Sequence, residues 1–159
     1  MQNVATLDVV SQYEQERGKP TPSLNHALVQ SLLITTLERT YGNKYTVLSE
    51  LTLDMEPAAT PDVCIYPSLS PNWLRDEMRM TDPPLLVVEI LSPSQSVDDL
   101  LPKIERYFVA GVKSCWLVQP PLQQIAVFTP EAEPEVFTHG PVQDPASGFS
   151  VTIEDIFKT

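Results

Sequence analysis

The stretch 83–93, which reads PPLLVVEILSP, constrains the fold of this chain more than any other segment. It is a continuous apolar run with two prolines before it and Ser-Pro after it, which is typical of a buried strand. One carboxylate, that of Glu89, lies near the end of this predicted strand. Burial of a carboxylate is unfavourable unless a proton, a cation or hydrogen-bond donors replace the lost water. Glu89 is therefore either an ordinary strand-end residue, which reaches solvent or pairs with an arginine, or part of a functional site.

The segments on both sides of this strand alternate between helical and extended patterns. Apolar residues at helical spacing predict a helix over 24–40, with Ser23 as its N-cap and Gly42 at its end. Alternating polarity over 45–55 predicts a half-buried strand, and segment 67–82 is expected to be a loop with a short helical piece at 71–79. Further strands are expected at 63–66, 125–128 and 135–138, followed by a terminal segment at 152–157.

A helix is expected directly after the central strand. Asp98 or Asp99 caps it, Pro102 falls in its first turn and Gly111 ends it. The strand 112–118 follows, and a strand–helix–strand unit of this kind places its two strands parallel through a right-handed crossover. The sequence therefore predicts an α/β protein with a mixed central sheet of about five or six strands flanked by helices.

Length and composition favour one domain over residues 1–159, with residues 1–23 as an N-terminal arm that begins with a weakly amphipathic segment at 7–13. Hydrophobic residues make up 42% of the chain and charged residues 19%, and no apolar run is long enough to span a membrane. We therefore expect a cytoplasmic protein in which Cys64 and Cys115 are core residues. The net charge of −11 argues against broad capture of a phosphate backbone, but not against a local site where metal ions supply positive charge.

Three polar residues are arranged so that they can form such a site. Asp62 opens the short strand at 63–66, and if this strand neighbours the central one, Asp62 and Glu89 meet at one end of the sheet. Two adjacent carboxylates favour a hard divalent cation between them. Lys103 follows in the next helix, on the same face as Tyr107, where an ammonium group could assist an attacking water. On spacing alone, an ordinary solvated lysine is the more common reading of such a residue.

The ordered set of segments resembles a known family. It comprises PDV at 61–63, PLLVVEILSPS at 84–94, Lys103, Tyr107, AGV at 110–112 and WLV at 116–118. Together these are similar to the bacterial putative restriction endonuclease family, a domain of unknown function within the PD-(D/E)XK nuclease superfamily. The resemblance runs from about residue 23 to residue 157, and it implies a restriction-endonuclease-like fold.

The resemblance also implies roles for individual residues. Asp62 matches the first metal-binding aspartate of the superfamily and Glu89 its second acidic ligand. The usual lysine position, two residues further on, is Leu91 here, so the role of that lysine passes to Lys103 in the following helix. His26 matches a histidine early in the first helix of the family. It either faces the site or bonds a nearby backbone carbonyl.

The resemblance implies a Mg²⁺-dependent or Mn²⁺-dependent nuclease. Asp62, Glu89 and the backbone carbonyl of Ile90 are then the expected metal ligands, and Lys103 the catalytic lysine. Glu50 is either a further ligand or a solvent-facing residue. The expected partner is nucleic acid, with DNA preferred, and no membrane.

A homodimer is also expected, because the late strands carry more apolar surface than one subunit is expected to cover, in Trp116, Ile125, Phe128 and Phe137. The alternative is a catalytically silent, dimerising module that binds a protein partner. Five basic residues separate the two readings: Arg75, Arg79, Lys103, Arg106 and Lys113. Their placement around the carboxylates would favour the nuclease, and their placement elsewhere would favour the module.

Overall fold

The computed structural model describes residues 19–158, so the predicted amphipathic segment 7–13 lies outside the described residues. The helices are α2 (Leu24–Tyr41), α3 (Val97–Val109), α4 (Ile153–Ile156) and the short 3-10 helix η1 (Pro120–Leu122). The strands are β1 (Tyr45–Ser49), β2 (Val63–Pro67), β3 (Leu86–Ile90), β4 (Ser114–Gln119), β5 (Gln124–Thr129) and β6 (Ala132–Phe137). Among the helices described, none combines the length and the apolar character that a membrane span requires.

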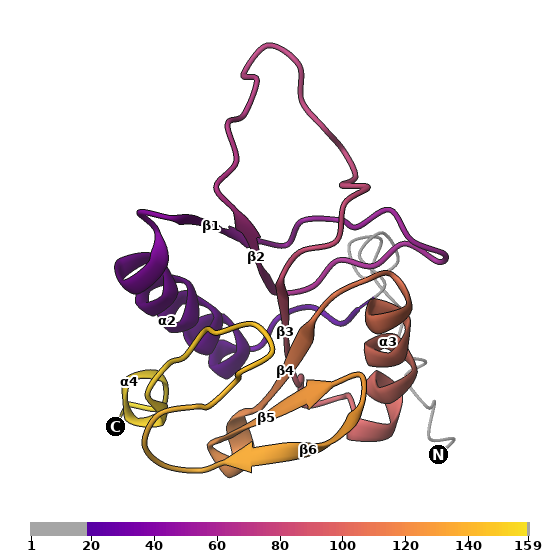
Figure 1. The fold of residues 1–159 in the computed structure, drawn as a ribbon. Helices are drawn as coiled ribbons and strands as arrows, with labels where there is room; N and C mark the ends of the chain where they lie inside the picture. The colour runs from indigo at the N-terminus through magenta and orange to yellow at the C-terminus, as the bar shows by residue number, and fades with distance from the viewer. Residues whose placement is uncertain (1–18, 159) are drawn as a thin grey trace, which may run out of the picture.

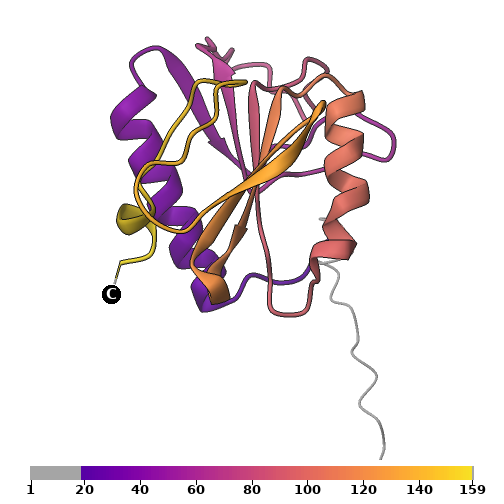
Figure 2. The ribbon, with the colours of Figure 1, turned by 60° about the horizontal axis from the view of Figure 1, so that its bottom comes forward.

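The strands of the described region form one six-stranded sheet in the order β1-β2-β3-β4-β5-β6. Strands β3 and β4 are parallel, and the other neighbouring pairs are antiparallel. The predicted crossover is confirmed, since α3 connects the two parallel strands. Helices α2 and α4 cover one face of the sheet and α3 covers the other (Figures 1 and 2). The predicted mixed sheet flanked by helices is therefore the observed fold.

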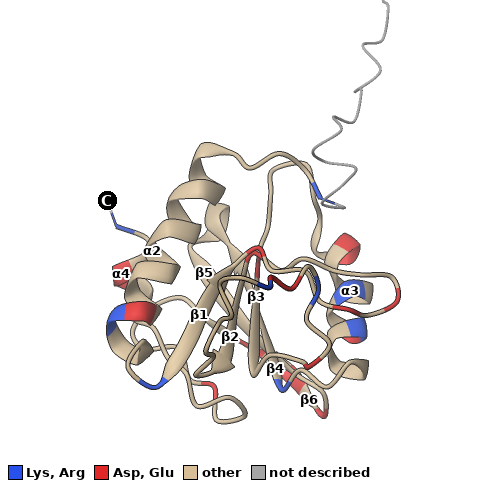
Figure 3. Ribbon diagram, turned by 90° about the horizontal axis from the view of Figure 1, so that it is seen from above, with Lys and Arg blue, Asp and Glu red and all other residues tan. Residues whose placement is uncertain are grey.

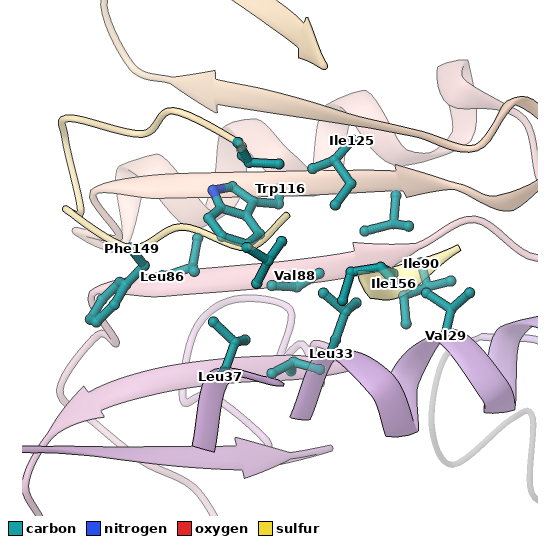
Figure 4. Packing of buried hydrophobic residues seen from close by; sticks show 14 of the residues in the cluster. Val29, Leu33, Leu37, Leu86, Val88, Ile90, Trp116, Ile125, Phe149 and Ile156 are labelled. Carbon is teal, nitrogen blue, oxygen red and sulfur yellow. The ribbon is translucent and has the colours of Figure 1, made fainter. Parts of the chain in front are cut away.

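The larger core lies between the sheet and α2. Val29, Leu33 and Leu37 lie on one stripe of this helix and pack against inward side chains of the central strands, including Val88 and Trp116 (Figure 4). On the other face, Ile104 and Tyr107 of α3 pack over a second cluster. Both cysteines are free and buried in that second cluster, as expected.

Strand β3 is buried along its whole length, Glu89 included. Because both faces are covered, its side chains meet either α2 or α3 instead of water. Its neighbour β2 is antiparallel, with Val63 opposite Val88. This register decides which polar residues share the end of the sheet.

The prediction of one strand over 45–55 was wrong. Strand β1 ends at Ser49, and Glu50 takes a positive φ of 54° that turns the chain. The later half forms only isolated bridges, in which Leu53 pairs with Ala59 and Met80. The polarity of this segment alternates as in a strand, but the left-handed turn at Glu50 breaks the ladder.

Two predictions around the helices also need correction. Helix α3 begins at Val97, because Ser96 and Asp99 form a reciprocal capping box. Neither Asp98 nor Asp99 is the N-cap, and Pro102 consequently falls in the second turn of the helix. The segment 71–79 contains turns and bends but no helix.

The reason given for a dimer does not hold. Trp116 and Ile125 are fully buried within one subunit, and Phe137 is half-buried against the same cluster. Phe128 is also only partly exposed. The loop between β2 and β3 instead carries the exposed apolar groups, as described below.

Candidate active site at the ends of strands β2 and β3

Asp62 and Glu89 are brought together by the pairing of β2 with β3. Asp62 directly precedes β2, and Glu89 is the next-to-last residue of β3. Because Val63 lies opposite Val88, the next step of the antiparallel ladder places the positions of Asp62 and Glu89 opposite each other. Both residues are buried, with exposures of 1% and 2%. Two carboxylates removed from water in this way require compensating charge or hydrogen bonds.

Asp62 is compensated on both of its oxygens. Its Oδ1 lies 2.6 Å from the Lys19 Nζ. Its Oδ2 accepts a hydrogen bond of 2.7 Å from the Ile90 backbone N–H and lies 3.2 Å from the His26 Nε2. The contact with Ile90 fixes the aspartate side chain directly to the end of β3.

These contacts keep the Asp62 carboxylate ionised. Burial alone raises its pKa, but the hydrogen bond from His26 and the positive charge of Lys19 outweigh burial. The pKa of Asp62 falls as a result from the usual 3.8 to about 2. At neutral pH the group is therefore a full anion and a competent ligand for a cation.

Glu89 is held by two residues from successive turns of α3. Its Oε1 accepts a hydrogen bond of 2.5 Å from the Tyr107 hydroxyl and lies 2.9 Å from the Lys103 Nζ. Helical spacing places these two side chains on one face, and the lysine ammonium also lies 5.9 Å from the tyrosine ring centroid. The structure thus brings Lys103, Tyr107 and Glu89 together.

The Tyr107 hydroxyl is a hydrogen-bond donor at any ordinary pH. Burial raises its pKa well above the usual value, and the neighbouring negative charge of Glu89 raises it further. The phenol therefore keeps its proton and directs it at the Glu89 carboxylate. The contacts of Tyr107 and Lys103 are both made to the same oxygen of Glu89, Oε1.

His26 faces the site. Ser23 caps α2 by accepting a hydrogen bond from the His26 N–H, and the imidazole is buried against Asp62. Of the two readings left open by the sequence, this contact favours the first. The Nδ1 atom of His26 has no hydrogen-bond partner within the described residues.

Glu50 contributes its main chain to the site. Its backbone N–H donates to the Asp62 carbonyl over 3.2 Å, and the residue is exposed. This bond continues the register of β1 and β2, in which Ser49 lies opposite Val63.

Two residues that contact Asp62 were not predicted from the sequence. Lys19 is buried and also donates to the Thr60 carbonyl over 2.7 Å, although it stands in a polar segment that resembles a solvated arm. Gln30 donates to the Asp62 carbonyl over 3.1 Å. Gln30 follows His26 by one helical turn, so helical spacing could have indicated that both face the same way.

The oxygen atoms of Asp62, Glu89 and the Ile90 carbonyl are ligands of the kind that a hard divalent cation prefers. In the part of the chain that the structure describes, no group of three or more His, Cys, Asp or Glu side chains could hold a metal ion. Two carboxylates and a backbone carbonyl are nevertheless sufficient for Mg²⁺, which keeps several water ligands. The Ile90 N–H points toward Asp62, whereas that of Leu91 points toward β4. Because the N–H and C=O of one strand residue point to the same side, the Ile90 carbonyl also faces the Asp62 side.

The basic residues do not surround this site as a nuclease was expected to require. Arg75 and Arg79 lie in the loop at the other end of β2 and β3, and Lys113 precedes the β4 residue that pairs with the start of β3. Arg106 lines a separate pocket beside Pro83. Of the five basic residues considered from the sequence, Lys103 alone contacts Asp62 or Glu89. Acidic and basic residues are interspersed on the face seen in Figure 3.

Comparison with known proteins agrees with the fold and identifies the family. The family model for Uma2, described as putative restriction endonuclease, matches residues 14–154. The chain is also similar to the crystal structure of a putative nuclease belonging to DUF820 from Anabaena variabilis. The two proteins share 24% sequence identity over 87% of this chain and 83% of the other, with a TM-score of 0.74, which shows a common fold.

No curated protein matches the chain. The family match nonetheless spans well over half of the sequence, and its range includes the described residues that contact Asp62 and Glu89. The chain therefore belongs to the Uma2 family of putative restriction endonucleases.

Proposed function

We propose that this protein is a metal-dependent nuclease that hydrolyses phosphodiester bonds of nucleic acid. The observation that carries the proposal is the pair of buried carboxylates, Asp62 and Glu89, each in contact with a lysine ammonium group. Buried ionisable groups clustered with charged partners in this way are more typical of a functional site than of a structural core. In this proposal Asp62, Glu89 and the Ile90 carbonyl hold Mg²⁺ or Mn²⁺, and Lys103 is the catalytic lysine.

Each residue of the site has a separate task. The metal ion, when bound, supplies an activated water and neutralises charge on the phosphate. Tyr107 fixes the orientation of Glu89 through its short hydrogen bond, and His26 and the Ile90 N–H fix Asp62. Lys103 keeps its ammonium beside Glu89, where it can orient an attacking water and stabilise negative charge at the scissile phosphate.

The substrate is expected to be DNA, and the protein is expected to act in the cytoplasm. Incubation of the purified protein with duplex DNA, single-stranded DNA and RNA, with Mg²⁺ or Mn²⁺, tests the proposal. Cleavage should require the metal and should be lost in Asp62→Asn and Glu89→Gln. Glu105→Gln is the matched control, because Glu105 is exposed on α3. Absence of metal-dependent cleavage of all three substrates by the wild type would refute the proposal.

A second candidate function is a catalytically silent module that binds a protein partner. The observation that favours it is electrostatic, since the net charge is −11 and the arginines considered above lie away from the carboxylates. A structure determined after soaking in Mn²⁺ separates the two candidates. Density between Asp62 and Glu89 supports the nuclease, and its absence supports the module.

We also infer that the protein forms a homodimer through the loop between β2 and β3. This loop projects away from the sheet (Figure 1) and exposes large apolar side chains, of which Trp73, Leu74 and Met78 are the most exposed. A pocket of about 310 Å³ lies beside them, with Leu48, Leu51 and Pro71 among its lining residues. The pocket is also lined by Arg75 and Glu77, so its lining is both apolar and charged. Projecting apolar groups beside such a pocket can form a self-complementary surface, as a two-fold interface requires.

A further inference from the structure

Lys19 is a buried cation at the centre of the proposed metal site. Its side chain is only 6% exposed, compared with 15% for Lys103. Its Nζ donates to the Thr60 carbonyl over 2.7 Å and to Asp62 Oδ1 over 2.6 Å. Lysine is among the residues least often buried, because its ammonium loses strong hydration, so this placement requires a specific partner.

The partner is the Asp62 carboxylate. Asp62 Oδ2 already accepts from the Ile90 N–H and lies against His26. Oδ1 is therefore the oxygen left for a cation, and the Lys19 ammonium is in contact with it. A divalent ion that bound Asp62 through Oδ1 would meet the ammonium at close range.

The charges of Asp62, Glu89, Lys19 and Lys103 also indicate that a divalent ion and the Lys19 ammonium exclude each other. Asp62 and Glu89 are matched by Lys19 and Lys103, one ammonium for each carboxylate. A divalent ion added to this balanced set leaves surplus positive charge in a buried site, which is strongly unfavourable. Departure of Lys19 from Asp62 removes half of that surplus, whereas Lys103 remains on Glu89 for catalysis.

We propose that Lys19 is an intramolecular competitor for the divalent cation: its ammonium takes the metal's place on Asp62 Oδ1 and leaves that oxygen when the metal binds. The inference rests on the metal site of the proposed function. It assigns to the segment before α2 a role in setting metal affinity. Lys19 is thus a positioning residue that acts through Asp62.

Metal affinity measured on variants tests this role without any nuclease assay. Mn²⁺ binding is followed by electron paramagnetic resonance and calorimetry for wild type, Lys19→Met, Lys19→Arg and Lys113→Met. Lys19→Met keeps the apolar stem without the charge, and we expect it to bind Mn²⁺ on the order of ten-fold more tightly. Lys19→Arg retains a competing cation and should bind no more tightly than wild type. Lys113→Met, which changes a lysine at the other end of the sheet, should leave the affinity unchanged.

A merely structural lysine would give the opposite result. Loss of its contacts would loosen the site, so Lys19→Met would bind Mn²⁺ as weakly as wild type or more weakly, and the inference would be overturned. If wild type binds no Mn²⁺ and Lys19→Met does, the inference is supported. If neither binds, both the inference and the metal site fail. Tighter binding without any nuclease activity would refute the proposed function alone.

Amine labelling of the wild-type protein gives a second readout that needs no variant. The acetylation rate of each lysine is measured by mass spectrometry with and without Mn²⁺. The buried Lys19 amine should react slowly without metal and faster as Mn²⁺ displaces it, while the Lys113 rate stays constant. An unchanged Lys19 rate under conditions in which Mn²⁺ binds would show that the ammonium stays on Asp62, contrary to the inference.

Discussion

Two buried tyrosines donate hydrogen bonds to different kinds of acceptor. The loss of stability on removal of each hydroxyl therefore shows how strong the hydrogen bond to Glu89 is. Tyr107 donates to the Glu89 carboxylate and Tyr66 to the neutral Asp82 carbonyl. Hydrogen bonds to charged groups contribute about 1.5–3 kcal/mol and neutral ones about 1 kcal/mol. We therefore expect Tyr107→Phe to reduce the free energy of unfolding by about 2 kcal/mol and Tyr66→Phe by about half as much. Urea denaturation measures both, and equal losses would contradict a charged Glu89.

The lowered pKa of Asp62 predicts acid sensitivity. Its pKa is about 2 in the folded protein against a usual 3.8, so the folded state binds this proton less tightly than the unfolded chain. The resulting stabilisation, about 2 kcal/mol, is complete above pH 4 and is lost as the pH falls from about 4 toward 2. Between pH 6 and 3, the free energy of unfolding should decline more steeply for wild type than for Asp62→Asn. Parallel curves below pH 4 would rule out this contribution.

Substitution of Lys103 should affect catalysis without affecting folding. Its side chain is partly exposed, so Lys103→Met should keep the fold, as judged by circular dichroism. If the ammonium supplies about 3 kcal/mol at the transition state, cleavage should fall on the order of 10²-fold or more. Steady-state cleavage rates at saturating Mg²⁺ provide the measurement. Unchanged cleavage would remove Lys103 from the mechanism.

At the scale of elements, the start of α3 controls where Lys103 and Tyr107 lie. Ser96 accepts from the Asp99 N–H, and the Asp99 carboxylate accepts from the Ser96 N–H, which satisfies two backbone donors at the helix N-terminus. Ser96→Ala should reduce the free energy of unfolding by about 1 kcal/mol. Ser94→Ala, an exposed serine in the preceding turn, serves as the control and should change it by less than about 0.5 kcal/mol. Equal effects of the two substitutions would show that the cap is not what stabilises α3.

The elements that could be predicted are those whose signals are local. The apolar run of β3, the spacing of α2 and the crossover through α3 follow from periodicity and from turn residues. The end of β1 could not be predicted, because Glu50 adopts a positive φ that no local pattern in segment 45–55 indicates. The burial of Lys19 could not be predicted for the same reason. Its partners, Thr60 and Asp62, lie far along the chain, and no local pattern distinguishes it from a solvated lysine. Asp62 and Glu89 could be paired from sequence because each lies at the end of a recognisable strand.

On the scale of the whole molecule, self-association has to overcome a net charge of −11. The loop between β2 and β3 is suited to this, because its charged residues nearly balance. Arg75 and Arg79 flank Asp76 and Glu77 there, and Asp82 leaves a single surplus negative charge, so two copies related by a two-fold axis can place opposite charges together. The loop also lies at the end of the sheet away from Asp62 and Glu89, so a dimer formed there leaves the candidate site accessible.

The tip of this loop should therefore decide the oligomeric state. Trp73 and Leu74 are 90% and 95% exposed, more than large apolar residues usually are without a partner. We expect light scattering to report a dimer for wild type and a monomer for the double variant Trp73→Ala and Leu74→Ala, because removal of both side chains eliminates the anchor of the interface. Leu122→Ala, which removes an exposed leucine from η1, is the matched control and should remain a dimer. A wild-type protein that stays monomeric at high concentration, or a double variant that still pairs, would exclude the loop as the interface.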